Sequence, residues 1–312
     1  MSEDFNTSFD DIEITPEIQR AAKRSTWVSV IVNIVLSSLQ IGVGIFAKSQ
    51  ALISDGIHSL SDLVADFVVI VAGHHSAKEA DDGHPYGHRR YENAASLVLG
   101  GLLLAVAIGM VFRAVEKFID PAAIAHVHIT ALWVALAAII MKELLFRYML
   151  AAAKRVRSSM LAANAWHARS DAASSLVVAI GIIGNLLGYP LLDPLAALIV
   201  GVMVGKMGIE FGWQAFHDLM DAAADDETLD RIRDTLPHLE GVLGFHDLRT
   251  RKLGDMVNVD VHIEVCDSLS VVEGHDVAER VINKLKSIHN VIGVMVHIDP
   301  VKQGGQPDNQ AV

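Results

Sequence analysis

The residues of this chain that are best suited to bind a metal ion form two histidine–aspartate pairs with the same spacing. One pair is His58 and Asp62, and the other is His167 and Asp171. Residues four positions apart lie on one face of a helix, so each pair would present an imidazole beside a carboxylate. Two such faces supply two nitrogen and two oxygen ligands, which is the set that a tetrahedral Zn²⁺ accepts. The alternative is that each pair only forms a hydrogen bond that ties helices together.

Both pairs lie in apolar surroundings. The 312 residues are 52% hydrophobic, which is more apolar than an ordinary soluble enzyme of this length. Six stretches are long enough to span a membrane, namely 26–48, 50–73, 92–114, 127–150, 161–187 and 190–208. The second and fifth are the least hydrophobic because they contain the two pairs. A carboxylate inside a membrane is unfavourable by roughly 2.5–3.5 kcal/mol, so Asp62 and Asp171 need a partner, and a shared cation would be one.

Charge and cysteine content narrow the class of protein further. Basic residues gather before the first span, between spans two and three, and between spans four and five, which predicts that both termini face the cytoplasm. The net charge of −12 argues against a nucleic-acid partner. A single cysteine, Cys266, excludes intrachain disulfides and a cysteine-based zinc site. Residues 1–25 are expected to form a cytoplasmic tail without a cleavable signal peptide.

A second group of possible metal ligands lies in the loop that joins spans two and three. Asp81, His84 and His88 are spaced for a metal ion, and Pro85 and Gly87 favour a tight connection. A polar loop with chance histidines is the alternative.

The last third of the chain has the pattern of a small α+β domain. Residues 256–266 alternate strictly between apolar and polar side chains, as in a half-buried strand. Helices are predicted over 228–238 and 272–288, and further strands over 245–250 and 291–299. The order αββαβ predicts a two-layer α+β unit. His262, His297 and Asp299 would lie on the polar faces of strands, where water alone could satisfy them.

Together, the paired membrane motifs, the loop Asp-Asp-Gly-His-Pro-Tyr-Gly-His and the tail resemble the cation diffusion facilitator family over about residues 21–300. The resemblance implies a six-helix membrane transporter domain over 26–212 and a metallochaperone-like cytoplasmic domain over 213–303. The polar composition of residues 304–312 predicts a disordered end. The resemblance implies metal sites at the following residues: His58, Asp62, His167 and Asp171 (transport site); Asp81, His84 and His88 (loop site); His246, His262, His275, His297 and Asp299 (tail site). It also implies a salt link between Arg90 and Asp221, with arginine where the family has lysine.

The function predicted from these residues is export of a divalent metal ion from the cytoplasm in exchange for protons. Zinc is the expected metal, since His58 adds a second imidazole where an all-oxygen site would suit manganese better. Zn²⁺ would be the substrate, with no organic cofactor. The resemblance also implies that the chain forms a homodimer, expected in the inner membrane, and that zinc bound by the tail is a regulatory ion. Fe²⁺, Co²⁺, Cd²⁺ and Ni²⁺ remain alternative substrates. The rival functions are a membrane-anchored metal sensor and a membrane metalloenzyme, although a closed four-ligand site leaves no position for a catalytic water.

Overall fold

The described part of the chain contains six long helices followed by a small α+β unit. The computed structural model describes residues 16–302 except 77, 121–123, 125, 156–158 and 255, and it leaves out the side chains of 16–23, 69, 159–164, 167 and 170. The chain divides into two compact units, residues 1–67 with 101–209 and residues 68–100 with 210–312.

The six long helices correspond one to one to the six predicted spans. They are α1 (Pro16–Ala47), α2 (Gln50–Ser76), α3 (Arg90–Ile119), α4 (Ile129–Arg155), α5 (Ser159–Leu186) and α6 (Leu192–Leu219). Among the described residues, five of them are long and apolar enough to cross a membrane, and α5 contributes the shorter apolar run Asp171–Leu186. The predicted helical membrane domain is therefore confirmed, and the helices extend beyond the predicted spans at most of their ends.

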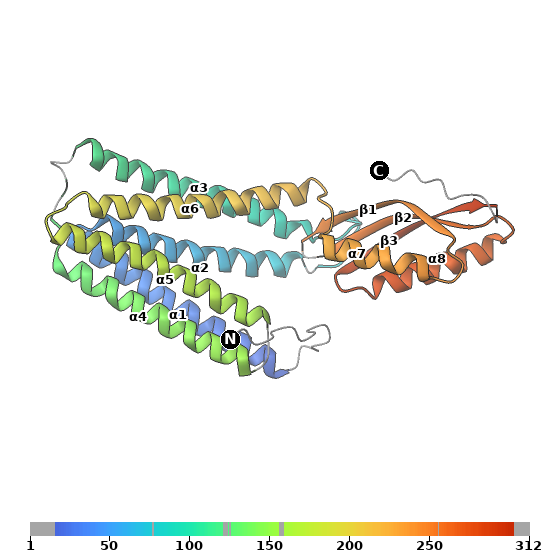
Figure 1. Ribbon diagram of the computed structural model, residues 1–312, viewed down its shortest axis with the longest axis horizontal. Coiled ribbons are helices and arrows are strands. Elements are labelled where there is room, and N and C mark those ends of the chain that lie inside the picture. Colours follow the sequence, from blue (N-terminus) through green and yellow to red (C-terminus); the bar gives the residue numbers. More distant parts are fainter. Residues whose placement is uncertain are drawn as a thin grey trace, which may run out of the picture. The chain divides into compact units, whose positions relative to one another are not determined.

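Small residues allow the helices to approach one another closely. A methyl group added at Gly44 of α1 would lie 2.7 Å from Cγ1 of Ile53 on α2, and one at Gly184 of α5 would overlap Leu192 of α6. Helix α4 packs along both α1 and α5, as Figure 1 shows. Close backbone contact of this kind is how membrane helices gain packing energy without a hydrophobic driving force.

Many large apolar side chains on these helices point outward. Phe46 is 88% exposed and Phe112 is 70% exposed, whereas Ala135 and Ala138 of α4 are completely buried. In water such a surface would be an aggregation site, but in a bilayer it is the face that contacts lipid tails. The distribution of side chains therefore agrees with a membrane domain.

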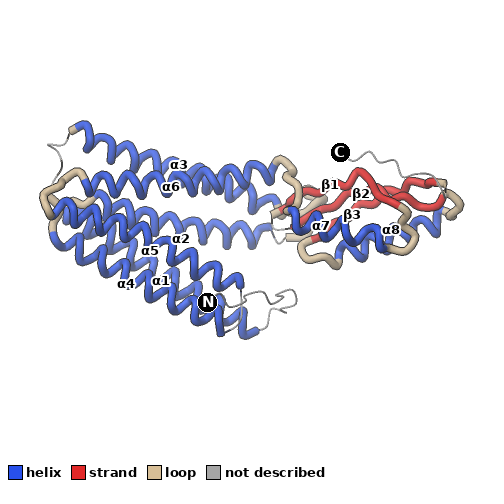
Figure 2. The backbone as a smooth tube through the Cα atoms, in the orientation of Figure 1, coloured by secondary structure: helices blue, strands red, loops and turns tan. Residues whose placement is uncertain are grey.

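The second unit contains a three-stranded sheet with helices on one face (Figure 2). Its elements are α7 (Asp226–Thr235), the 3₁₀ helix η2 (Leu236–His238), β1 (Gly244–Leu253), β2 (Met256–Cys266), α8 (Val271–Lys286) and β3 (Val291–Val301). The strand order is β1-β2-β3, with β1 antiparallel and β3 parallel to β2. The predicted αββαβ order is confirmed.

The central strand β2 separates the core of this unit from its polar face. Its residues Val257, Val259, Val261, Ile263 and Val265 are buried and pack in one cluster with apolar residues of α7 and α8. Since successive side chains of a strand point to opposite faces, the intervening residues, His262 among them, face away from the helices. The hydrophobic pattern thus fixes which face of the sheet carries the polar side chains.

Candidate metal centres

Helices α2 and α5 bring together three of the four residues of the predicted transport site. Ligand atoms of His58, Asp62 and Asp171 all lie within 4.8 Å of one another. The Nδ1 atom of His58 is 3.8 Å from Oδ1 of Asp62, and the two side chains are only 7% and 16% exposed. The fourth residue, His167, belongs to α5 four positions before Asp171, but its side chain lies outside the described residues.

This group has the composition of a cation site. Two carboxylates held within 4.8 Å of each other inside a helical bundle repel one another unless a cation or a proton lies between them. An imidazole beside them adds a nitrogen ligand, which suits Zn²⁺ and other late divalent metals. The arrangement can therefore bind a divalent ion and release it again when protons compete for the same atoms.

A neighbouring carboxylate, Asp55, lies one helical turn before His58 and has a different role. It is completely buried, and its oxygens accept hydrogen bonds from Gln40 on α1 at 2.5 Å and from Ser174 and Ser175 on α5 at 3.1 and 2.6 Å. Asp55 is not in the group of His58, Asp62 and Asp171 that could share an ion. Asp55 therefore lies beside the possible metal ligands, and its hydrogen bonds join α2 to α1 and α5.

Lys142, near the middle of α4, is also buried, and its place beside this group was not predicted from the sequence. Its Nζ atom is 3.5 Å from Oδ1 of Asp55 and donates hydrogen bonds to the main-chain oxygen of Asp171 at 3.2 Å and to Oγ of Ser175 at 2.8 Å. A lysine in the middle of an apolar span was the signal that could have revealed it, because ionisable residues in such spans usually face the bundle interior.

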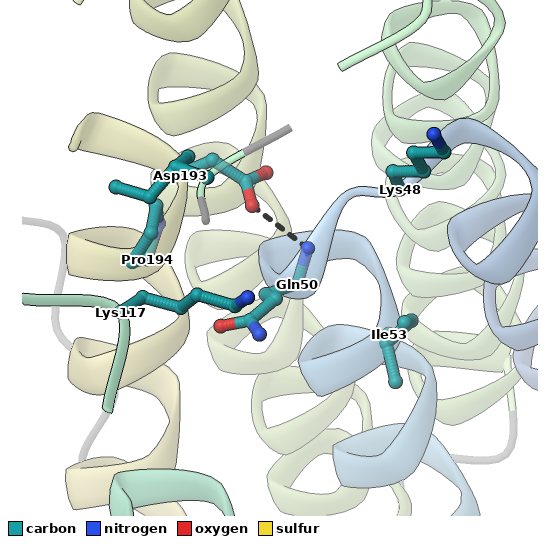
Figure 3. Close-up of a pocket in the computed structure, with 7 residues that line it drawn as sticks. Lys48, Gln50, Ile53, Lys117, Asp193 and Pro194 are labelled. Carbon is teal, nitrogen blue, oxygen red and sulfur yellow. Dashed lines mark hydrogen bonds between the residues drawn. The ribbon is translucent and has the colours of Figure 1, made fainter. Parts of the chain in front are cut away.

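Another contact that the sequence did not reveal joins the start of α2 to the start of α6. Asp193 accepts hydrogen bonds from the hydroxyl of Ser49 at 2.5 Å and from the main-chain nitrogen of Gln50 at 2.7 Å, the latter drawn in Figure 3. The carboxylate thus caps the first turn of α2. The pocket in Figure 3, of about 290 Å³, is lined by Lys48 and Lys117 as well as Asp193, and none of the three grouped transport-site residues lines it.

The predicted loop site is also brought together. Asp81, His84 and His88 could share one ion: Oδ1 of Asp81 is 3.3 Å from Nδ1 of His84, and Oδ2 is 3.4 Å from Nε2 of His88. His88 donates its Nδ1 hydrogen to the main-chain oxygen of Glu79 at 3.1 Å, which leaves Nε2 available as a ligand.

The backbone of the loop prepares Asp81 for this role. Its carboxylate accepts hydrogen bonds from the main-chain nitrogens of His84 at 2.7 Å and Gly83 at 2.9 Å. The hydrogen bond from the His84 main chain is the largest cause that lowers the pKa of Asp81, followed by smaller contributions that include the bond from Gly83. The ionised form, which is the form that binds metal, is therefore favoured.

Arg90, at the start of α3, and Asp221, just after α6, form an ion pair. The pair joins two segments that are 131 positions apart in the sequence, as the resemblance implied. Both side chains are about half exposed, so the pair is expected to contribute about 1 kcal/mol or less.

The tail site is made by the register of the sheet. His246 on β1 pairs with His262 on β2, and His262 pairs with His297 on β3, so one row crosses all three strands. Asp299 follows two residues after His297 on β3. Its Oδ2 atom is 3.2 Å from Nε2 of His246 and 3.0 Å from Nδ1 of His262, and its Oδ1 atom is 3.4 Å from Nε2 of His297. His246, His262 and Asp299 could share an ion, and His297 lies beside them.

His275 lies apart from this row within the chain. It is on α8, which covers the apolar face of the sheet, and its Nε2 atom is 3.7 Å from Oε1 of Glu279 on the same helix. The resemblance grouped His275 with residues that lie, within one chain, on the opposite face of the sheet.

The comparisons with known proteins match both parts of the chain. The model of the cation efflux transmembrane domain matches residues 26–220, and that of the cation efflux protein cytoplasmic domain matches residues 224–301. The chain is 34% identical to Metal tolerance protein 2 of Oryza sativa over 93% of its own length and 80% of that protein. It is 34% identical to an uncharacterised transporter of Methanocaldococcus jannaschii (90% and 99%) and 30% identical to a manganese efflux system protein of Bacillus subtilis (88% and 94%). The chain therefore belongs to the cation efflux, or cation diffusion facilitator, family, and it is a divalent metal exporter with a helical transmembrane domain and a cytoplasmic domain.

Proposed function

We propose that this protein exports Zn²⁺ from the cytoplasm in exchange for protons. The observation that carries the proposal is the group of His58, Asp62 and Asp171 at the meeting of α2 and α5, with His167 four positions before Asp171. The four side chains would provide two imidazoles and two carboxylates, a set that fits a tetrahedral zinc ion. The metal is the substrate, so the site has to bind it and release it in every cycle.

Zinc and manganese are the two substrates that need to be compared. Two relatives at 30% and 27% identity are manganese efflux system proteins of Bacillus subtilis, which favours Mn²⁺ as the second candidate. Manganese prefers oxygen ligands and six-fold coordination, whereas imidazole suits zinc. With His58 and His167 as ligands, zinc is the better fit, and Fe²⁺, Co²⁺, Cd²⁺ and Ni²⁺ remain in the panel to be tested.

Exchange for protons follows from the chemistry of the ligands. An imidazole binds metal only in its neutral form and a carboxylate only in its ionised form, so binding of the ion expels protons. Protons that reach the site from the other side of the membrane compete for the same atoms and help to release the metal. Histidine is suited to this exchange because its unperturbed pKa, about 6.5, lies in the physiological range.

We propose that both termini face the cytoplasm and that the helices lie in the inner membrane. The orientation rests on the basic residues, which are concentrated before the first span, between spans two and three, and between spans four and five, because such segments usually remain on the cytoplasmic side. The protein is proposed to act as a homodimer joined through the cytoplasmic domain. Zinc held by His246, His262 and Asp299, with His297 beside them, would regulate that domain, and the loop site would hold a further ion near the ends of α2 and α3.

Flux of metal into proteoliposomes that contain the full chain tests the proposal. Zinc uptake driven by an opposing proton gradient, together with loss of uptake in His58→Ala and Asp171→Ala variants that still insert and dimerise, is the expected result. His217→Ala, a change at an exposed residue near the end of α6, is the matched control. Unchanged zinc uptake in both site variants would rule out the transport site. Zinc binding without any metal uptake would instead identify a membrane-anchored sensor.

A further inference from the structure

Lys142 forms the centre of a buried polar network beside the proposed transport site. Its side chain is on α4, which supplies none of the proposed ligands, and the residue is only 3% exposed. The three hydrogens of its ammonium group have three acceptors: Oδ1 of Asp55, Oγ of Ser175 and the main-chain oxygen of Asp171. Such complete pairing is required of a buried charge, because an unpaired ammonium in this position would be very unfavourable.

The partner carboxylate is equally well bonded. Asp55 is fully buried and accepts from Gln40, Ser174 and Ser175 in addition to its contact with Lys142. One positive and one negative charge thus balance within the bundle, and the hydroxyl groups satisfy the remaining lone pairs. The pair is therefore a fixed component of the bundle, since loss of either member would leave the other buried without compensation.

The position of this network relates it to metal binding. On α2, Asp55 lies three residues before His58, so the two share a face. On α5, the network includes the carbonyl group of Asp171 itself and the hydroxyl group of Ser175 one turn later. Lys142 therefore connects the two ligand-bearing helices about one turn from the place where their ligands meet.

We propose that Lys142 is a positioning residue that sets the metal selectivity of the transport site. By holding Asp55 of α2 and Asp171 of α5 at a fixed separation, it keeps the ligand atoms close enough for a small tetrahedral ion. Manganese requires longer bonds and more ligands, so a site that cannot widen discriminates against it. Lys142 touches no substrate in this account and acts through the helices that carry the ligands. The inference rests on the proposed function of that site.

The test removes the network without leaving a buried charge. The double variant Lys142→Met with Asp55→Asn replaces both charged groups by neutral groups of similar size, and Lys154→Met, at an exposed position in the last turn of α4, is the matched control. Zinc and manganese fluxes are measured on the full chain in proteoliposomes. The KM for zinc is expected to rise about tenfold, as for other groups that orient metal ligands. The manganese-to-zinc ratio of kcat/KM should rise with it, while Lys154→Met behaves as the unaltered chain.

The variant Lys142→Arg is a second, independent test of the same ratio. It keeps the positive charge but replaces the ammonium by the larger, planar guanidinium group. It should shift the same ratio toward manganese without the loss of a charge. If the double variant inserts and keeps the KM and the metal ratio of the unaltered chain, Lys142 only stabilises the bundle and the inference is wrong. If the double variant fails to insert, an unchanged ratio in Lys142→Arg overturns it in the same way. Failure of the proposed function would be seen separately, as absence of zinc flux in the unaltered chain.

Discussion

Replacing His58 by aspartate tests the identity of the ligands most directly. The change His58→Asp would turn a set of two nitrogens and two oxygens into one nitrogen and three oxygens. It alters the chemistry of one ligand while it keeps a group that can bind metal at the same position. The expected result is therefore a change in the choice of metal rather than a simple loss of transport.

The size of the effect can be worked out from the geometry of the site. A carboxylate at His58 would lie within roughly 4.8 Å of two others, and each repulsion would amount to about 3.5 kcal/mol at an effective dielectric constant of about 20. Zinc and manganese carry the same charge and relieve this repulsion equally. The repulsion therefore largely cancels in the difference between their binding free energies. The loss of the imidazole does not cancel, because zinc gains more from nitrogen ligands than manganese does. The manganese-to-zinc ratio of kcat/KM should rise by at least about tenfold, the lower end of the effect of residues that orient metal ligands.

The assay is initial flux into proteoliposomes over a range of free zinc and free manganese concentrations. His217→Asp places the same new charge at an exposed position near the end of α6 and serves as the control. A ratio for His58→Asp that stays within about twofold of the unaltered chain would show that His58 does not bind the transported ion, and it would refute the reasoning.

Three further perturbations follow from other parts of the structure. Asp299→Asn should weaken zinc binding by the tail about 10-fold to 100-fold, because three imidazoles lie within 3.4 Å of this carboxylate. Equal zinc affinities of the variant and the unaltered chain in a calorimetric titration would contradict this. Gly184→Val should cost about 1–3 kcal/mol, since a side chain there would overlap α6, whereas Gly42→Val has open space and should leave the melting temperature unchanged. Asp225→Ala should destabilise α7 by about 1 kcal/mol, because Asp225 caps the helix through the main-chain nitrogen of Thr228. That hydrogen bond lowers the pKa of Asp225, so its contribution is present above the unfolded pKa and disappears as the pH falls through the lowered value. Amide exchange in α7 should then differ between the two proteins at neutral pH and converge in acid, and an equal difference at every pH would speak against the cap.

Local pattern was enough to predict most of the elements. The strict alternation of residues 256–266 predicted both the bounds and the buried face of β2, because a period of two is unmistakable over eleven residues. The helix-spacing rule likewise predicted that His58 and Asp62 share a face of α2. Both predictions needed only interactions within one element.

What the sequence did not reveal depends on contacts between elements. Ser49 and Asp193 are 144 positions apart, and nothing local to either indicates the other. Lys142 was counted simply as part of an apolar span, because hydropathy averages over a window and does not show which face a charge occupies. The resemblance grouped His275 with the tail histidines, whereas its place on α8 follows from the packing of the helix on the sheet.

The row of histidines across the tail sheet has a consequence for the stability of that domain. Its members come from three strands, so an ion bound to His246 and Asp299 would close a loop of roughly fifty residues, much as a disulfide does. In the chain-entropy account, a cross-link of that span stabilises the folded state by about 4 kcal/mol, because it restricts the unfolded chain. A chain with one cysteine cannot form an intrachain disulfide, and a bound metal ion could provide an equivalent cross-link. Unlike a disulfide, this cross-link would form and dissociate as the concentration of free metal changes. The melting temperature of the tail would therefore depend on how much free metal the cell contains.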